Sequence, residues 1–160
     1  MIFDFSRIKN SKNLLAFSGG VDSSALFFLL LNHKIDFDIA IVNYNTREQS
    51  KDEIAYALNL AKEYKKEIFI KDVKLENSSN FEKNARDIRY IFFEQIIKEN
   101  SYETLITAHQ LNDRLEWFLM QLSKGAGLVE LFGIREFEEK KDYTVFRPLL
   151  NVSKDELENY

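Results

Sequence analysis

The segment from residue 18 to residue 24 has the composition of a phosphate-binding loop. It reads Ser-Gly-Gly-Val-Asp-Ser-Ser and lies between an apolar run that predicts a strand and an apolar run that predicts a helix. Gly19 and Gly20 let the backbone turn tightly and come close to a ligand. The following helix directs free N–H groups and its positive dipole end toward that ligand, and the serines add hydroxyl donors. The sequence therefore predicts a cradle for a pyrophosphate anion.

Asp22 separates this loop from other nucleotide-binding loops. The loop lacks the Gly-Lys-Ser/Thr ending of a Walker A motif, and it lacks the Gly-x-Gly-x-x-Gly dinucleotide fingerprint. A carboxylate beside an anion is unfavourable unless a cation bridges the two, so Asp22 implies Mg²⁺. A helix cap after a glycine turn is the simpler alternative, but a cap needs only one of these residues. The predicted nucleotide-binding residues are Ser18, Gly19, Gly20, Val21, Asp22, Ser23 and Ser24.

Arg86 and Arg89 form a second candidate set. They are three residues apart on a predicted helix and therefore share a face. An arginine pair suits the recognition of phosphate or carboxylate groups. The alternative is a solvated helix face on which these arginines pair with Glu82 and Asp87.

His109, Asp113 and Glu116 cluster at a predicted strand-to-helix junction. Asp113 and Glu116 are one helical turn apart, so their carboxylates face the same way. Two acids at the carboxyl end of a strand could hold Mg²⁺ or an ammonium group, and His109 could assist a proton transfer or bind phosphate. The alternative makes Asp113 a partner of the helix dipole and His109 a buried structural residue.

Strand and helix patterns alternate along the chain, which predicts βαβ units and an α/β fold with a parallel sheet between helices. The predicted strands are 13–17, 37–42, 68–73, 104–107 and 143–146. Helices are predicted over 22–32, behind capping boxes at 50–53 and 79–82, and from the fourth strand to about residue 122. Ligands in this architecture bind at the carboxyl ends of the strands. The predicted site therefore lies in the loops that begin at Ser18, Asn43, Val73 and Ala108.

Composition excludes several kinds of protein. The chain has 160 residues and no cysteine, so disulfides, thiolate metal sites and cysteine nucleophiles are excluded. No apolar stretch approaches the roughly 20 residues of a membrane span, and the start lacks a signal-peptide pattern, so we expect a soluble cytoplasmic protein. The net charge is −4, whereas nucleic-acid binders usually carry a basic surplus. Either the protein touches no nucleic acid, or its RNA-binding surface lies elsewhere.

Five segments carry a resemblance to known enzymes. Residues 18–23 are similar to the Ser-Gly-Gly-x-Asp-Ser loop of the N-type ATP pyrophosphatase (PP-loop) superfamily, whose members cleave ATP between the α and β phosphates. The other segments resemble motifs of the tRNA(Ile)-lysidine synthetase family, and their joint order and spacing carry the identification. They are Glu-x-x-Ala-Arg-x-x-Arg-Tyr at 82–90, Thr-Ala-His at 107–109 with the acids behind it, Gly-x-Gly-Leu at 125–128, and Arg-Pro-Leu-Leu at 147–150.

The sequence also departs from that family's pattern. Behind Thr-Ala-His, the family's second histidine is Gln110, its first aspartate is Asn112 and its glutamine is Arg114. The family's His-Gly-Leu-Arg loop after the second strand reads Tyr-Asn-Thr-Arg here, and only Arg47 matches. The absence of cysteine disfavours the sulfur-transferring relatives, which typically need paired cysteines, and favours a free amine as the nucleophile.

The resemblance implies a fold, a reaction and a set of roles. The fold is adenine nucleotide alpha hydrolase-like, with a five-stranded parallel sheet in the order 3-2-1-4-5. ATP adenylates the C2 oxygen of the wobble cytidine in a CAU anticodon of tRNA(Ile), and the ε-amine of free lysine then displaces AMP to give lysidine. The cofactors are ATP and Mg²⁺, with Asp22 and Asp113 as metal ligands. The implied catalytic residues are Asp22, Arg86, Arg89, His109, Asp113 and Glu116.

Several alternatives stay open at this level. An ATP-dependent ligase of the amidotransferase type could act on a small metabolite, and a non-catalytic module could bind nucleotide without releasing pyrophosphate. Residues 1–150 are predicted as one catalytic domain, and residues 151–160 as the truncated start of a following helix, with a short terminal helix as the alternative. The sequence does not decide between a monomer and a homodimer.

Overall fold

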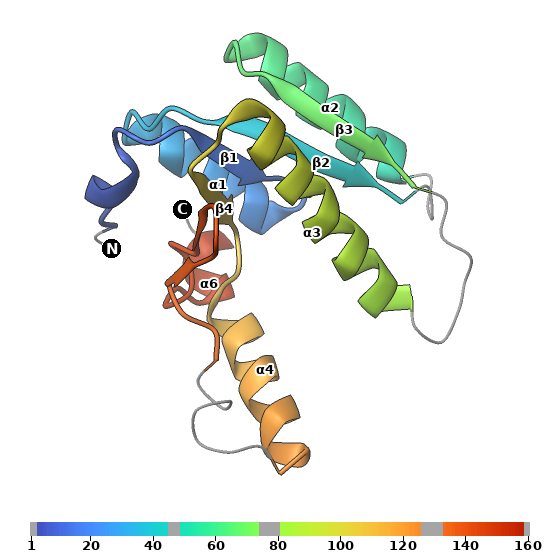
Figure 1. Ribbon diagram of the computed structural model, residues 1–160, viewed down its shortest axis with the longest axis vertical. Coiled ribbons are helices and arrows are strands. Elements are labelled where there is room, and N and C mark those ends of the chain that lie inside the picture. The colour runs from blue at the N-terminus through green and yellow to red at the C-terminus, as the bar shows by residue number, and fades with distance from the viewer. Residues whose placement is uncertain (1–2, 45–48, 74–80, 126–132, 159–160) are drawn as a thin grey trace.

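The computed structural model describes residues 3–44, 49–73, 81–125 and 133–158, in which strands alternate with helices as predicted (Figure 1). Each predicted strand recurs with its ends shifted by at most one residue. The strands are β1 (Asn13–Ala16), β2 (Asp38–Asn43), β3 (Ile68–Asp72), β4 (Thr104–Thr107), β5 (Phe137–Glu139) and β6 (Thr144–Phe146). The helices are η1 (Ser6–Ile8), α1 (Val21–Asn32), α2 (Gln49–Glu63), α3 (Phe81–Asn100), α4 (Leu111–Ser123) and α6 (Lys154–Glu158).

The six-stranded sheet has the order β3-β2-β1-β4-β6-β5. The first five strands of this order are mutually parallel, which confirms the predicted order 3-2-1-4-5 with β6 as the fifth strand. Strand β5, which pairs antiparallel with β6 at the edge of the sheet, was not predicted. It has three residues, two of them glutamates, and so gives no apolar alternation for a pattern to detect.

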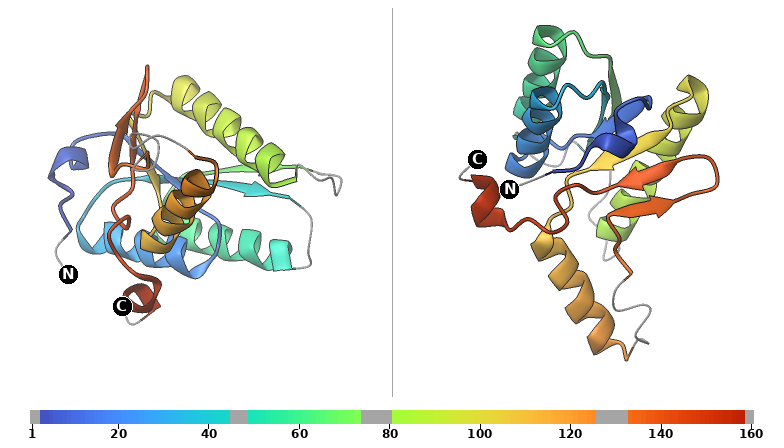
Figure 2. Two further views of the ribbon diagram at one scale, coloured as in Figure 1. Left: turned by 90° about the horizontal axis from the view of Figure 1, so that it is seen from below. Right: turned by 90° about the vertical axis from the view of Figure 1, so that its left-hand side faces the viewer.

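Helices cover both faces of the sheet (Figure 2). Alternate strand residues such as Leu15, Ile39 and Ile106 join the core under α1 and α2, whereas Leu14 and Leu105 join the core under α3. This period of two is expected for strands that are buried on both faces. Helix α4 extends away from the body of the domain, and none of its residues is buried (Figure 1).

Two predicted helix details differ from the structure. The pattern behind residue 50 places Ile54, Leu58 and Ala61 on one face of the helix. Ala61 is buried and Ile54 packs against the core, but Leu58 is 45% exposed, and Ala57 and Leu60 are buried as well. The face of α2 that packs against the sheet lies to one side of Leu58. The spacing of apolar residues in the sequence does not show how the helix is rotated against the sheet. Helix α2 also begins at Gln49, so Ser50 lies within the helix and not ahead of it. The second predicted capping box, at 79–82, falls on side chains outside the described residues.

The helix start predicted within residues 151–160 is found at α6, and a capping box precedes it. The Glu156 N–H donates to Ser153 Oγ over 3.3 Å, and the Ser153 N–H donates to Glu156 Oε2 over 2.9 Å. These are the reciprocal bonds of a capping box.

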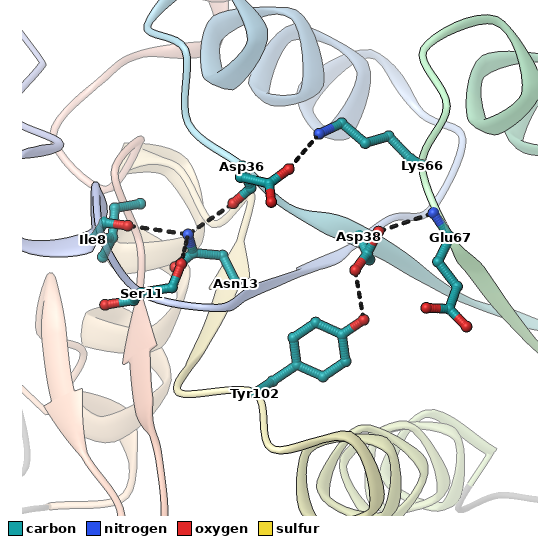
Figure 3. A network of polar contacts seen from close by, with 8 residues as sticks. All are labelled: Ile8, Ser11, Asn13, Asp36, Asp38, Lys66, Glu67 and Tyr102. Carbon is teal, nitrogen blue, oxygen red and sulfur yellow. Dashed lines mark hydrogen bonds and ion pairs between the residues drawn. The ribbon is translucent and has the colours of Figure 1, made fainter.

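A polar network joins the strands at their amino ends (Figure 3). The Asn13 side chain donates to the carbonyl oxygens of Ile8, Ser11 and Asp36 over 2.8–3.0 Å. The Tyr102 hydroxyl donates to the Asp38 carboxylate over 2.7 Å, and burial together with this carboxylate raises the pKa of the phenol. These bonds tie together the segments that lead into β1, β2 and β4, so the amino ends of the strands are used for structure. Ligands in this architecture bind at the opposite, carboxyl ends of the strands. None of the described helices has the length and apolar character needed to cross a membrane.

Candidate functional site

A pocket of about 470 Å³ opens at the carboxyl ends of β1, β2 and β4. Its lining comes from the loops predicted at residues 18, 43 and 108, whereas the loop after Val73 lies outside the described residues. The predicted residues that line it are Ser18, Gly20, Asp22, Ser23, Arg89, His109 and Asp113. Its volume lies in the range of roughly 300–1,000 Å³ typical of small-molecule sites.

The backbone of the phosphate loop needs glycine at residue 19. Gly19 has φ +79°, and a Cβ there would lie 2.8 Å from Glu53 Cβ on α2. A side chain would therefore both strain the loop and collide with the helix stem. Gly20 is the residue directly before α1. The first N–H groups of that helix have no acceptor within the helix and are therefore available to a ligand at the loop.

The serine hydroxyls act first within the loop itself. Ser23 Oγ and Ser24 Oγ donate to the Gly20 carbonyl oxygen over 3.0 Å and 2.9 Å, and Ser23 is buried. Ser18 Oγ lies 3.1 Å from Ser23 Oγ. Val21 is 57% exposed and, like Ser24, does not line the pocket. The loop therefore offers mainly backbone N–H groups and Ser18 to an anion, and the other serines hold its shape.

Asp22 has a partner that the sequence analysis did not identify. Gln110 Nε2 donates a hydrogen bond to Asp22 Oδ2 over 2.9 Å, although the two residues are 88 positions apart. The Gln110 backbone N–H donates to Asp113 Oδ2 over 2.8 Å. Asp113 thus caps the first turn of α4, as the alternative interpretation held, and also lines the pocket. The only signal in the sequence was the departure from the family pattern at Gln110.

His109 is a neutral hydrogen-bonding group in this pocket. Its Nδ1 lies 2.8 Å from Thr107 Oγ1 at the end of β4. Burial, reinforced by the positive charge of Arg147, lowers the pKa of His109 to about 4. At pH 7 the imidazole is therefore uncharged, so it suits a hydrogen bond to substrate better than a charge-based grip on phosphate.

The pKa of His109 predicts how stability depends on pH. The unfolded chain binds a proton near pH 6.5, whereas the folded chain does so only near pH 4, so folding loses stability as the pH falls between these values. We expect His109→Gln to reduce the stability lost in this window by on the order of 2 kcal/mol. Urea unfolding at both ends of the window measures the difference. Identical losses in wild type and variant would contradict the assignment.

A second hollow, of about 780 Å³, adjoins the first. The two share Tyr44, Arg89, Tyr90, His109 and Asp113, and the second is also lined by Arg86, Glu116, Trp117 and Lys124. The Arg86 guanidinium lies 5.9 Å from the Tyr90 ring centroid and 6.0 Å from that of Trp117. The predicted residues thus divide between two connected spaces, one beside the phosphate loop and one that is cationic and aromatic.

Tyr44 and Arg147 make structural hydrogen bonds between the elements around the two hollows. The Tyr44 hydroxyl donates to the Ala85 carbonyl oxygen over 2.9 Å, which ties the end of β2 to α3. Arg147 is 6% exposed and donates to Glu138 Oε2 over 2.8 Å and to the Arg135 carbonyl oxygen over 2.9 Å. It therefore holds the β5–β6 hairpin. Arg47 and the Glu82 side chain, named in the sequence analysis, lie outside the description.

The residues present fit a nucleotide with Mg²⁺. The tight glycine turn and the open end of α1 suit a polyphosphate. No group of three or more metal-binding side chains occurs among residues the structure describes, so the protein offers no complete metal cage of its own there. Mg²⁺ in phosphate-transfer sites typically takes one or two carboxylates and completes its shell with phosphate oxygens and water. Asp22 and Asp113, held by one residue, match that requirement.

Comparison with known proteins gives one family and close relatives. The family model described as the PP-loop domain matches residues 3–160. The chain is similar to a curated tRNA(Ile)-lysidine synthase of Campylobacter jejuni, with 56% identity over 153 residues that cover 96% of this chain and 47% of that protein. It is similar to one of Helicobacter pylori, with 54% identity over 150 residues that cover 94% of this chain and 44% of that protein. The chain thus spans slightly less than half the length of these relatives.

A solved structure supports the fold. The U34-tRNA thiolase NcsA from Methanococcus maripaludis, solved with its 4Fe-4S cluster, superposes with a TM-score of 0.76 at 22% identity, covering 98% of this chain and 57% of that one. At this identity the likeness concerns the fold alone.

Proposed function

Because the chain belongs to the PP-loop domain family, we propose that its pocket binds ATP with Mg²⁺ for the ligation of lysine to tRNA. The acceptor is the wobble cytidine of a tRNA(Ile) with a CAU anticodon, and the product is lysidine. The names of relatives at 54–56% identity support this substrate. The retained motif residues in both hollows support it as well.

The proposed reaction has two steps, the adenylation of cytidine and the displacement of AMP by lysine. The C2 oxygen of cytidine attacks the α-phosphorus of ATP, and pyrophosphate leaves. The ε-ammonium of lysine then loses one proton to water, and the free amine attacks C2. The bond from C2 to its oxygen breaks, AMP takes that oxygen, and the newly bonded nitrogen loses one proton to water. When bound, Mg²⁺ supplies positive charge to the phosphate oxygens of the departing pyrophosphate.

Several of the predicted residues have a role in this scheme. The N–H groups of the phosphate loop would bind the polyphosphate, and Asp22 and Asp113 would hold Mg²⁺. Arg89 lies at the boundary of both hollows, where its charge stabilises the developing negative charge of the first step. Neutral His109 donates or accepts a hydrogen bond at the same boundary.

Arg86 and Glu116 belong to the second hollow only and suit the charged groups of free lysine. The guanidinium of Arg86 complements the carboxylate of the amino acid, and Glu116 complements its ammonium group. We propose that lysine enters from this side and meets the adenylated cytidine at the boundary between the hollows.

One observation carries the proposal: the phosphate loop shares a pocket with Arg89, His109 and Asp113, and an open hollow adjoins that pocket. A reaction with three substrates needs two such connected spaces. The products of ATP labelled on the α-phosphate test it. We expect labelled AMP that forms only with the CAU transcript present. Labelled ADP, or AMP formation that ignores RNA, would contradict the proposal.

A further inference from the structure

We propose that Gln110 is a positioning residue that orients the Asp22 carboxylate toward the bound nucleotide. The inference rests on the proposed Mg²⁺-ATP site and deepens it. Gln110 does not line the pocket, so it acts through Asp22 and not on the substrate.

Gln110 joins two loops that the chain keeps far apart. Its side chain reaches from the residue ahead of α4 to the first turn of α1, where Nε2 donates to Asp22 Oδ2 over 2.9 Å. Its backbone N–H donates to Asp113 Oδ2 over 2.8 Å. A single residue therefore donates hydrogen bonds to both carboxylates that are proposed to hold the metal.

The chemistry of an amide suits this position. An amide donates a hydrogen bond without a charge, so it fixes the Asp22 rotamer and leaves the negative charge of the carboxylate to attract a cation. A lysine or arginine would offset that charge and weaken metal binding. An apolar side chain would let Asp22 take other staggered rotamers.

The burial of Gln110 makes its orientation definite. The residue is 6% exposed, and its Oε1 is buried without a hydrogen-bond partner in the described part of the chain. Turning the amide round would place Oε1 against the Asp22 carboxylate, two acceptors in contact, so the donor must face Asp22. A buried carbonyl without a partner lowers stability. The side chain therefore serves the site at some cost to the fold.

The family pattern offers a natural replacement for this donor. The resembling family has histidine where this chain has Gln110. A histidine Nε2–H extends about as far from the backbone as a glutamine Nε2–H, so it could donate to Asp22 from the same place. Asparagine, one methylene shorter, could not.

The test measures the affinity for α,β-methylene-ATP by calorimetry over a series of Mg²⁺ concentrations. Gln110→Met keeps the length without the donor, Gln110→Asn keeps the amide without the length, and Gln110→His keeps a donor at the same reach. We expect the Mg²⁺ concentration that gives half of the maximal gain in nucleotide affinity to rise about 10-fold in the methionine and asparagine variants. An effect of this size is usual when a group that orients a metal ligand is lost. The affinity of these two variants in EDTA should equal that of wild type, and the histidine variant should stay within about 3-fold of wild type.

Thermal unfolding separates this role from a structural one. Gln110→Met removes the unpartnered Oε1, which favours the fold, and also the donor to Asp22, which disfavours it, so its midpoint should lie within a few degrees of that of wild type. A much larger fall would mark a structural role. If the methionine variant fails to fold, the asparagine variant carries the test alone.

Two results would overturn the inference while the proposed site stands. One is an unchanged Mg²⁺ requirement in the methionine and asparagine variants. The other is an equal loss in all three variants, because packing and not the hydrogen bond would then matter. A wild-type chain that binds the analogue with no dependence on Mg²⁺, or does not bind it, would instead refute the proposed site, and the inference with it.

Discussion

Replacing Asp22 with alanine is expected to lower the rate of AMP formation from ATP by about 100-fold or more, the size of effect seen when one group that stabilises transition-state charge is removed. Asp22 lies in the first turn of α1, lines the pocket, and is held by Gln110. Without its carboxylate, the metal loses a ligand beside the phosphates. Asp22→Asn, which keeps the shape but not the charge, is expected to lose nearly as much.

The control for this prediction is Asp87→Ala, which removes an exposed carboxylate on α3. Its rate should match that of wild type, and circular dichroism should show that every variant is folded. Wild-type rates in Asp22→Ala under saturating Mg²⁺ would refute the role of Asp22 in metal binding.

Replacing Gly19 with alanine is expected to weaken ATP binding by at least about 10-fold and to lower the free energy of unfolding by about 2–3 kcal/mol. At φ +79° an L side chain is strained, and its Cβ would meet Glu53 Cβ at 2.8 Å. The Glu53 Cβ belongs to the stem of α2 and cannot swing aside, so the loop has to move. That movement displaces the N–H groups that face the phosphates. Calorimetry with α,β-methylene-ATP and urea unfolding measure the two effects.

Gly125→Ala is the matched control for Gly19→Ala. Gly125 has φ +68°, but a Cβ there would meet no atom of the described residues within 4 Å. It should therefore cost only the backbone strain, about 1 kcal/mol, and leave ATP binding unchanged. If both variants behave alike, close packing against α2 is not what requires glycine at residue 19.

The sequence predicted the sheet because its signals are local. Runs such as Leu14-Leu15 and Ile39-Ala40-Ile41 are buried on both faces, and the helices between them carry apolar faces. The parallel sheet follows from the alternation of strands and helices, whereas the order of the strands was implied by the family resemblance. Strand β5 was not predicted because its residues carry no apolar pattern. Its position also depends on hydrogen bonds from Arg147, which lies directly after β6 and not within β5.

The candidate site was predictable only in part, since its contacts join distant segments. The glycine turn and Asp22 could be read from neighbouring residues. The bond from Gln110 to Asp22 could not, because it exists only once α4 and α1 start side by side. The lowered pKa of His109 likewise depends on its burial in the folded chain and on the charge of Arg147, which follows β6. Physical environment, and not residue type, decides such features.

The local charge around the site could not be predicted from the net charge of the whole chain. The net charge of −4 argues against RNA, yet Arg86, Arg89 and Lys124 all line the second hollow. Clustered cations at one opening can attract a polyanion even when the protein as a whole is acidic. The proposed tRNA would approach at this opening.

The most direct test of the proposed function is the incorporation of labelled lysine into two tRNA(Ile) transcripts, one with a CAU anticodon and one with UAU, in the presence of ATP and Mg²⁺. The proposal predicts label in the CAU transcript alone, with AMP released in step with the lysine joined. Equal label in both transcripts, or no label in the CAU transcript while ATP is consumed, would contradict it.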